Sequence, residues 1–309
     1  MLRWLALACV LPATWAAAQP LSPPTWAFPV PTGTRTPTPD DGKPRHVSDS
    51  KATFTVPQTR DQFFSPDWHP EDHPPMPPIV AVGRKPDVAA CGFCHRASGA
   101  GGPENSSLSG LPRDYLVRQL QAYRAGDRTS ALPDRVPAKM MIALAKALTD
   151  EEIDAAATYF AAVRPRPKFK VVETQTIPTP TIRNWTWTDA KTGEREPLGD
   201  RIIEMPDDFE VFELRDARAT FTTFVPVGSL VRGAELAVAC QACHGPTFNG
   251  QTVAPPLAGR SASYAMRQLY EFKTGARQSG NAALMKPVVE KLSLDDLRAL
   301  AAYLASLPP

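Results

Sequence analysis

Cysteine and histidine are both scarce in this sequence, with five of each among 309 residues. Four cysteines stand in two Cys-x-x-Cys pairs, and Cys9 lies in an apolar N-terminal segment, so no cysteines remain for a disulfide framework. Neither sign of charge is in excess, because the chain has 34 basic and 32 acidic residues. The composition therefore gives no indication of a nucleic acid or another polyanion as partner.

A long hydrophobic run is also missing. The apolar segment from Leu5 to Leu11 is shorter than the roughly 20 residues that a membrane span requires. It follows Arg3 and precedes the small residues Ala16 to Ala18, which is the pattern of a secretory signal peptide over residues 1–18. We therefore expect cleavage and export to the periplasm. An uncleaved membrane anchor is the alternative, and membrane association is not required.

Both cysteine pairs are followed directly by a histidine. The two segments are Cys91-Gly92-Phe93-Cys94-His95 and Cys240-Gln241-Ala242-Cys243-His244. In such a segment the two thiols form thioethers to one porphyrin, and the imidazole is the proximal ligand of its iron. A zinc site built from both pairs is the alternative, but zinc does not need a histidine after each pair. The sequence predicts two covalently attached c-type haems, bound through Cys91, Cys94, Cys240 and Cys243, with His95 and His244 on the irons.

The residues after the two motifs repeat. His95 falls on His244 at a shift of 149 positions. Further residues recur as identical residues at the same shift, namely Leu108, Gly110, Tyr115, Arg118, Gln119, Leu120, Gly126 and Arg128. After a five-residue deletion in a polar loop, Met141 falls on Met285. The chain thus contains two copies of one unit, which we place at residues 79–165 (the first unit) and 227–309 (the second unit).

Each unit has the apolar spacing of helices. Leu116, Leu120 and Tyr123 share one helix face in the first unit. Thr149 then opens a capping box ahead of a further amphipathic helix, and Ser293 takes its place in the second unit. We therefore expect a mainly α chain.

An arm precedes the units. Residues 19–78 hold 15 of the 34 prolines and show no helical periodicity, so we predict an extended arm rather than a domain. Trp68 is expected to fix this arm to a folded surface, with His69 and His73 hydrogen-bonded or solvated. The alternative is a metal site at His69, Asp72 and His73, or an approach of one of these residues or of Met76 to a haem iron.

An insert separates the units. Residues 166–226 are too long for a simple connector and contain alternating stretches, so we predict one or two β-hairpins packed against a haem unit. The expected strands are Ile182 to Thr188, Arg201 to Met205, Phe209 to Leu214 and Thr220 to Val225.

Methionine is the residue type that fits the sixth iron position in both units. Met141 stands seven residues before Leu148, and Met285 stands seven before Leu292. This equal placement favours iron ligation over core packing. Met140 is the immediate competitor of Met141.

The two units resemble class I cytochrome c domains, and their tandem arrangement is similar to the cytochrome c4 family. The resemblance rests on the Cys-x-x-Cys-His motifs, on Leu-x-Gly-x-x-x-x-Tyr-x-x-x-Gln and on the placement of the methionines. It implies two helical domains with His/Met-ligated haems and periplasmic electron transfer. The arm and the long insert depart from the family pattern. The family's proline that accepts the proximal histidine N–H is matched by Pro255, whereas Ser106 stands in that place in the first unit.

We therefore expect an electron carrier rather than an enzyme, one that passes single electrons from a periplasmic dehydrogenase to a terminal oxidase or another cytochrome. The alternative is a dihaem redox enzyme of the peroxidase or thiosulfate dehydrogenase type, which needs one open or labile iron position. Outside the two motifs, only His46, His69 and His73 remain, and all three lie in the arm.

Overall fold

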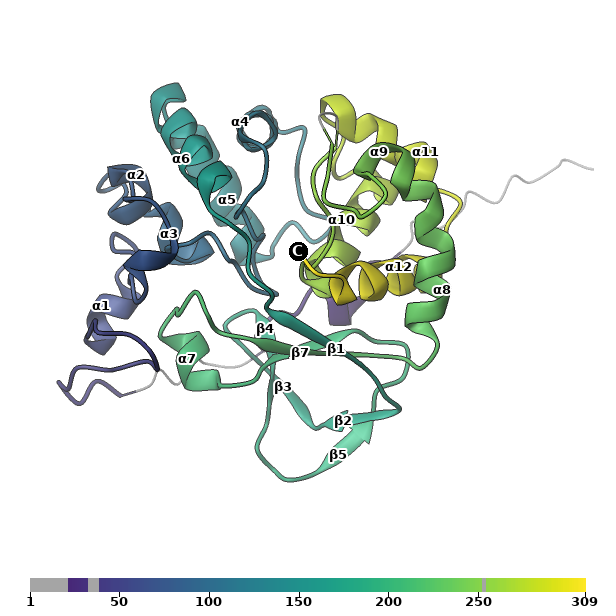
Figure 1. The fold of residues 1–309 in the computed structure, drawn as a ribbon, viewed down its shortest axis with the longest axis horizontal. Helices are drawn as coiled ribbons and strands as arrows, with labels where there is room; N and C mark the ends of the chain where they lie inside the picture. The colour runs from purple at the N-terminus through teal and green to yellow at the C-terminus, as the bar shows by residue number, and fades with distance from the viewer. Residues whose placement is uncertain (1–21, 33–38, 252–253) are drawn as a thin grey trace, which may run out of the picture.

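The computed structural model describes residues 22–32, 39–251 and 254–309, and it places two helical units above a layer of strands (Figure 1). The predicted signal peptide lies outside the described residues. Within them, no helix is both long and apolar enough to cross a bilayer.

The first unit is built from helices around one apolar core. Its helices are α2 (Pro78–Ala81), α3 (Cys91–His95), α4 (Arg113–Ala125), α5 (Val136–Ala147) and α6 (Asp150–Ala162). The predicted capping box is confirmed, because Thr149 accepts the N–H of Glu152 while the Glu152 carboxylate accepts the N–H of Thr149. Leu116, Ile153 and Phe160 fill the core between α4 and α6. This core fixes the helices around the first motif, which is α3 itself.

The second unit repeats the arrangement. It contains α8 (Ser229–Ala237), η3 (Val238–Cys240), α9 (Gln241–His244), α10 (Ala262–Thr274), η4 (Gly280–Leu284), α11 (Met285–Val289) and α12 (Leu294–Ser306). Ser293 and Asp296 form the second capping box. Gly233 lets α8 and α12 approach closely, since a Cβ at this position would lie 2.2 Å from the carbonyl oxygen of Ala299.

The insert contains more strands than the one or two hairpins predicted. Its elements are β1 (Phe169–Glu173), β2 (Thr176–Pro178), β3 (Pro180–Arg183), β4 (Thr186–Asp189), β5 (Arg195–Pro197), β6 (Ile203–Pro206), α7 (Phe209–Glu213) and β7 (Phe221–Val225). The largest sheet has the order β1-β7-β6, with β1 parallel and β6 antiparallel to β7. Two separate antiparallel pairs, β2-β5 and β3-β4, complete the layer.

Two strand predictions in the insert are wrong. The stretch from Ile182 to Thr188 is not one strand, because the chain turns at Asn184 and Trp185, both with positive φ, and forms the β3-β4 hairpin. The stretch that begins at Phe209 is helical, since the Asp208 side chain accepts the N–H groups at the start of α7. The strand predicted over Thr220 to Val225 is confirmed as β7.

The arm is mostly irregular and includes the short turns η1 (Thr25–Ala27), α1 (Val56–Arg60) and η2 (Pro70–Asp72). Trp68 fixes it to the insert as predicted, because its buried indole N–H donates to the carbonyl of Leu214 at 2.8 Å. His69 and His73 lie beside different carboxylates, those of Asp216 and Asp67. Among the described residues, no three His, Cys, Asp or Glu side chains lie close enough together to bind a metal ion.

Candidate haem sites

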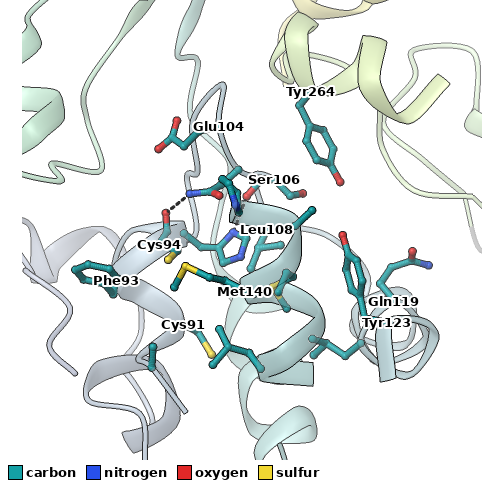
Figure 2. Close-up of a pocket in the computed structure, with 18 of the residues that line it drawn as sticks. Cys91, Phe93, Cys94, Glu104, Ser106, Leu108, Gln119, Tyr123, Met140 and Tyr264 are labelled. Carbon is teal, nitrogen blue, oxygen red and sulfur yellow. Dashed lines mark hydrogen bonds between the residues drawn. The ribbon is translucent and has the colours of Figure 1, made fainter. Parts of the chain in front are cut away.

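The first motif lies on a cavity of about 300 Å³. Cys91, Cys94 and His95 line it from α3, while Met140 and Met141 line it from α5. Figure 2 shows Met140 beside Cys91 and Cys94, with Tyr264 reaching in from the second unit. The predicted ligands of the first haem therefore converge on one space, and both candidate methionines belong to it.

Backbone carbonyls orient the two imidazoles in the same way. His95 Nδ1 lies 2.8 Å from the carbonyl oxygen of Ser106, and His244 Nδ1 lies 2.8 Å from that of Pro255. A carbonyl only accepts, so Nδ1 carries the proton and Nε2 is left for a metal. Ser106 thus takes the place of the proline, because the contact uses its backbone and not its side chain. Burial lowers the pKa of both imidazoles, which favours the neutral form that binds iron.

The second motif is more open. Cys240 is half-buried and Cys243 is exposed, whereas His244 is buried. Met285 is the first residue of α11 and packs, half-buried, against the core of the second unit. The chain places Met285 at the start of a helix, whereas Met141 lies in the middle of α5.

The two units meet through a pair of buried arginines that the repeat makes equivalent. Arg128 donates to Gln119, to the Tyr264 hydroxyl and to Gln268, with distances of 2.9 to 3.0 Å. Arg277 donates to the equivalent residues, one in its own unit and two in the first unit. These contacts join it to Gln268, Tyr115 and Gln119 at 2.7 to 2.9 Å. The tyrosines and glutamines therefore bridge the units, which is one of the roles open to repeated polar residues next to a haem motif.

These arginines also test whether the first cavity suits a haem. Within the described chain, the buried Nε atoms of Arg128 and Arg135 have no hydrogen-bond partner. Arg128, Arg135 and Arg267 line the cavity. Burial, together with the charge of Arg267, lowers the pKa of Arg135 to about 9. Buried N–H donors without acceptors fit a ligand that carries carboxylates, as a haem does through its propionates.

Sequence reasoning missed the roles of several of these residues. Nothing in the sequence places Arg135 and Arg267 on the first cavity, which both of them line. Arg128 belongs to the repeat, and its recurrence as Arg277 is a signal of a shared interface. Arg215, which packs against the first motif from the insert, has no counterpart in the repeat and gave no signal.

Comparisons with known proteins agree with the motifs. The family model described as cytochrome c matches residues 83–163 and 230–308, which together are just over half of the chain. A thiosulfate dehydrogenase electron acceptor of Thiomonas intermedia is 29% identical over 75% of this chain and 84% of its own length. A cytochrome c4 of Stutzerimonas stutzeri is 28% identical over 71% of this chain and 85% of its own.

A solved structure is also similar. The thiosulfate dehydrogenase TsdBA of Marichromatium purpuratum matches 74% of this chain with a TM-score of 0.50 and 28% identity. The match spans 39% of the length of that structure.

Proposed function

Because this chain belongs to the cytochrome c family and carries two covalently bound c-type haems, we propose that it is a periplasmic electron carrier. It takes single electrons from a dehydrogenase and passes them to a terminal oxidase or another cytochrome. The relatives named as cytochrome c4 and as a dehydrogenase electron acceptor support this role. The observation that carries it is the convergence of two cysteines, one oriented histidine and methionine thioethers on one cavity.

Each residue has a separate task in this proposal. Cys91, Cys94, Cys240 and Cys243 attach the haems, which supply a reversible one-electron couple when bound. His95 and His244 are the proximal ligands, held in one tautomer by backbone carbonyls. Met141 and Met285 are the distal ligands by their equal positions in the repeat. A thioether is a weak donor that favours the ferrous state, and a second protein ligand leaves no open position for a substrate.

The donor that we propose first is a thiosulfate dehydrogenase, by similarity to the electron acceptor of Thiomonas intermedia. Oxidised holoprotein mixed with thiosulfate and a catalytic amount of a purified bacterial thiosulfate dehydrogenase should become fully reduced, with two electrons taken up per chain. Omission of either thiosulfate or the dehydrogenase is the control. No reduction by this enzyme, with normal reduction by dithionite, contradicts this donor.

The second candidate is a dihaem redox enzyme, which the similarity to TsdBA of Marichromatium purpuratum favours. It requires an iron with an open or labile position. Reduction by thiosulfate alone, or binding of cyanide by the oxidised protein at rest, would support the enzyme. A spectrum that neither reagent changes supports the carrier.

A further inference from the structure

The same motif has two different surroundings in this chain. Phe93 and Cys94 of the first motif are half-buried. Ala242 and Cys243, at the equivalent positions of the second motif, are exposed. Two segments outside the repeat, the arm and the insert, contact the first motif. In Figure 1, α1 and α7 share one end of the molecule with α3, while α9 and α11 lie at the other end.

The insert covers the first motif with Arg215. Its guanidinium carbon lies 3.7 Å above the ring of Phe93. It also donates to the carbonyl of Phe93 and to that of Thr59, each at 2.8 Å, and so joins the insert, the motif and the arm. Arg215 has a positive φ of 62°, a conformation that the surrounding contacts must hold in place.

The arm covers the other side of the same motif. A Cβ at Gly92 would lie 2.2 Å from Oγ of Ser65, so the arm sits directly on the motif helix. The N–H of Ala90 also donates to the carbonyl of Gln62 at 2.9 Å. Gln241 is the residue equivalent to Gly92 in the second unit, and its side chain donates instead to the nearby carbonyl of Pro246. The first motif has glycine where the arm needs the space.

The cover is firmly attached. Asp72 of the arm accepts two hydrogen bonds from Arg218 of the insert, at 2.7 and 2.8 Å. This pairing lowers the pKa of Asp72, so the carboxylate stays charged at neutral pH. Together with the bond from Trp68 to Leu214, it fixes arm and insert as one layer over the first motif.

Exposed apolar residues stand near both the cysteine motif and the methionine of the second site in the sequence. Val238 precedes Cys240 by two residues and is 63% exposed. Leu284 precedes Met285 and is 68% exposed, and Val288 on α11 is 46% exposed. Exposed aliphatic side chains therefore stand within a few residues of both the motif and Met285 in the sequence, and we refer to Val238, Ala242, Leu284 and Val288 as the rim.

We propose that outside redox proteins dock only at the second motif, on the rim of Val238, Ala242, Leu284 and Val288, while arm and insert close the first motif to them. The partner is a redox protein with an apolar surface around its own cofactor. The four rim side chains are apolar, and the exposed Lys286 between Leu284 and Val288 adds one positive charge beside them, so the partner surface is apolar without an excess of positive charge. This proposal rests on the proposed carrier function and states at which end of the carrier exchange with partners occurs.

Covering can be measured without any partner or turnover. Hydroxyl-radical labelling of the holoprotein should modify Leu284 at least fivefold more than Phe93, after correction for intrinsic reactivity. Arg215→Ala should raise the labelling of Phe93 severalfold and leave Leu284 unchanged. Equal labelling of Phe93 and Leu284 in the wild type, or no response of Phe93 to Arg215→Ala, overturns the covering of the first motif.

Docking is tested by the second-order rate constant for oxidation of the reduced holoprotein by a soluble monohaem cytochrome c of higher potential. One electron leaves the reduced protein and reduces the oxidant, with no bond made or broken. Val238→Glu and Val238→Lys should each slow this reaction at least tenfold, because a charge of either sign in an apolar contact must be desolvated.

Val82 is the matched control, since it is a valine of the first unit that is 47% exposed. Val82→Glu and Val82→Lys should change the rate constant less than twofold. Equal effects at the two valines, or none at Val238, overturn the proposal. A wild type that reacts with no protein oxidant or donor refutes the carrier function instead, and the labelling contrast still decides whether the first motif is covered.

Discussion

Glu204 connects the insert to the second haem unit through a side chain that is almost fully buried. The residue is 1% exposed. Its two oxygens accept hydrogen bonds from the hydroxyls of Thr223 and Ser261 and from the N–H groups of Ala262 and Ser263, with distances of 2.6 to 3.0 Å. Two of these donors are N–H groups of the first turn of α10, which have no acceptor within the helix itself. The helix dipole favours a negative charge at this end.

The substitution Glu204→Gln keeps the size and shape of the side chain and replaces one of its two acceptor oxygens by an NH₂ group. One oxygen can still accept from Ala262 and Thr223. The new amide NH₂ then faces two donors, the N–H of Ser263 and the hydroxyl of Ser261. The Ser261 oxygen already accepts a hydrogen bond from the N–H of Tyr264. Two charge-assisted bonds are lost, each worth about 1.5–3 kcal/mol, and so is the interaction of the charge with the dipole. We expect a loss of at least about 3 kcal/mol in the free energy of unfolding of the second unit.

Urea unfolding of the holoprotein at pH 7, with hydrogen exchange of the α10 amides as a local probe, measures this loss. Glu173→Gln is the matched control, because Glu173 accepts one bond, from the N–H of Leu230 at the start of α8, and is half-buried. It should cost less than about 1 kcal/mol. If Glu204→Gln destabilises the protein no more than Glu173→Gln, the carboxylate does not have the role assigned to it.

Three further predictions concern the iron ligands, a buried lysine of the insert and a cation of the first cavity. In the ferrous state, Met285→Ala should bind carbon monoxide at one haem per chain and Met141→Ala at the other, whereas Met140→Ala should bind none. If Met140→Ala binds carbon monoxide and Met141→Ala does not, Met140 is the ligand of the first haem. Burial lowers the pKa of Lys168 to about 7, so between pH 7 and 10 the unfolded chain binds more protons and stability rises with pH. Urea unfolding at pH 7 and 9.5 should show a rise of at most about 3 kcal/mol, absent in Lys168→Met. Arg135→Leu removes a cation from the first cavity, which should lower one of two midpoints in a spectroscopic redox titration by tens of millivolts and leave the other unchanged.

The helical units were predictable because their signals are local. The 3.6-residue spacing around Leu116 and the capping boxes at Thr149 and Ser293 each act within one or two turns. The insert was less predictable because its elements depend on short-range details that alternation does not capture. The turn at Asn184 and the cap at Asp208 each replaced a strand with another element. The parallel pairing of β1 with β7, far apart in sequence, has no local signal.

The haem-attachment residues were predictable because the chemistry itself requires their spacing. The orientation of His95 was not, because its N–H donates to a backbone oxygen, and the residue type at that position, serine, carries no information about this bond. The buried cations of the first cavity were not predictable either. Arginine is usually exposed, and only the tertiary structure shows that Arg135 and Arg267 lie inside.

The repeat makes the two sites alike, and the segments outside it make them different. Arg128 and Arg277 keep the interface between the units symmetric, because each uses the partners that the other uses. Ser65 and Arg215 act on the first motif alone. A carrier with two equivalent open sites could receive and release electrons at either end. Closing one site by arm and insert leaves the second motif as the contact for outside proteins, and the first becomes an internal site that exchanges only within the molecule.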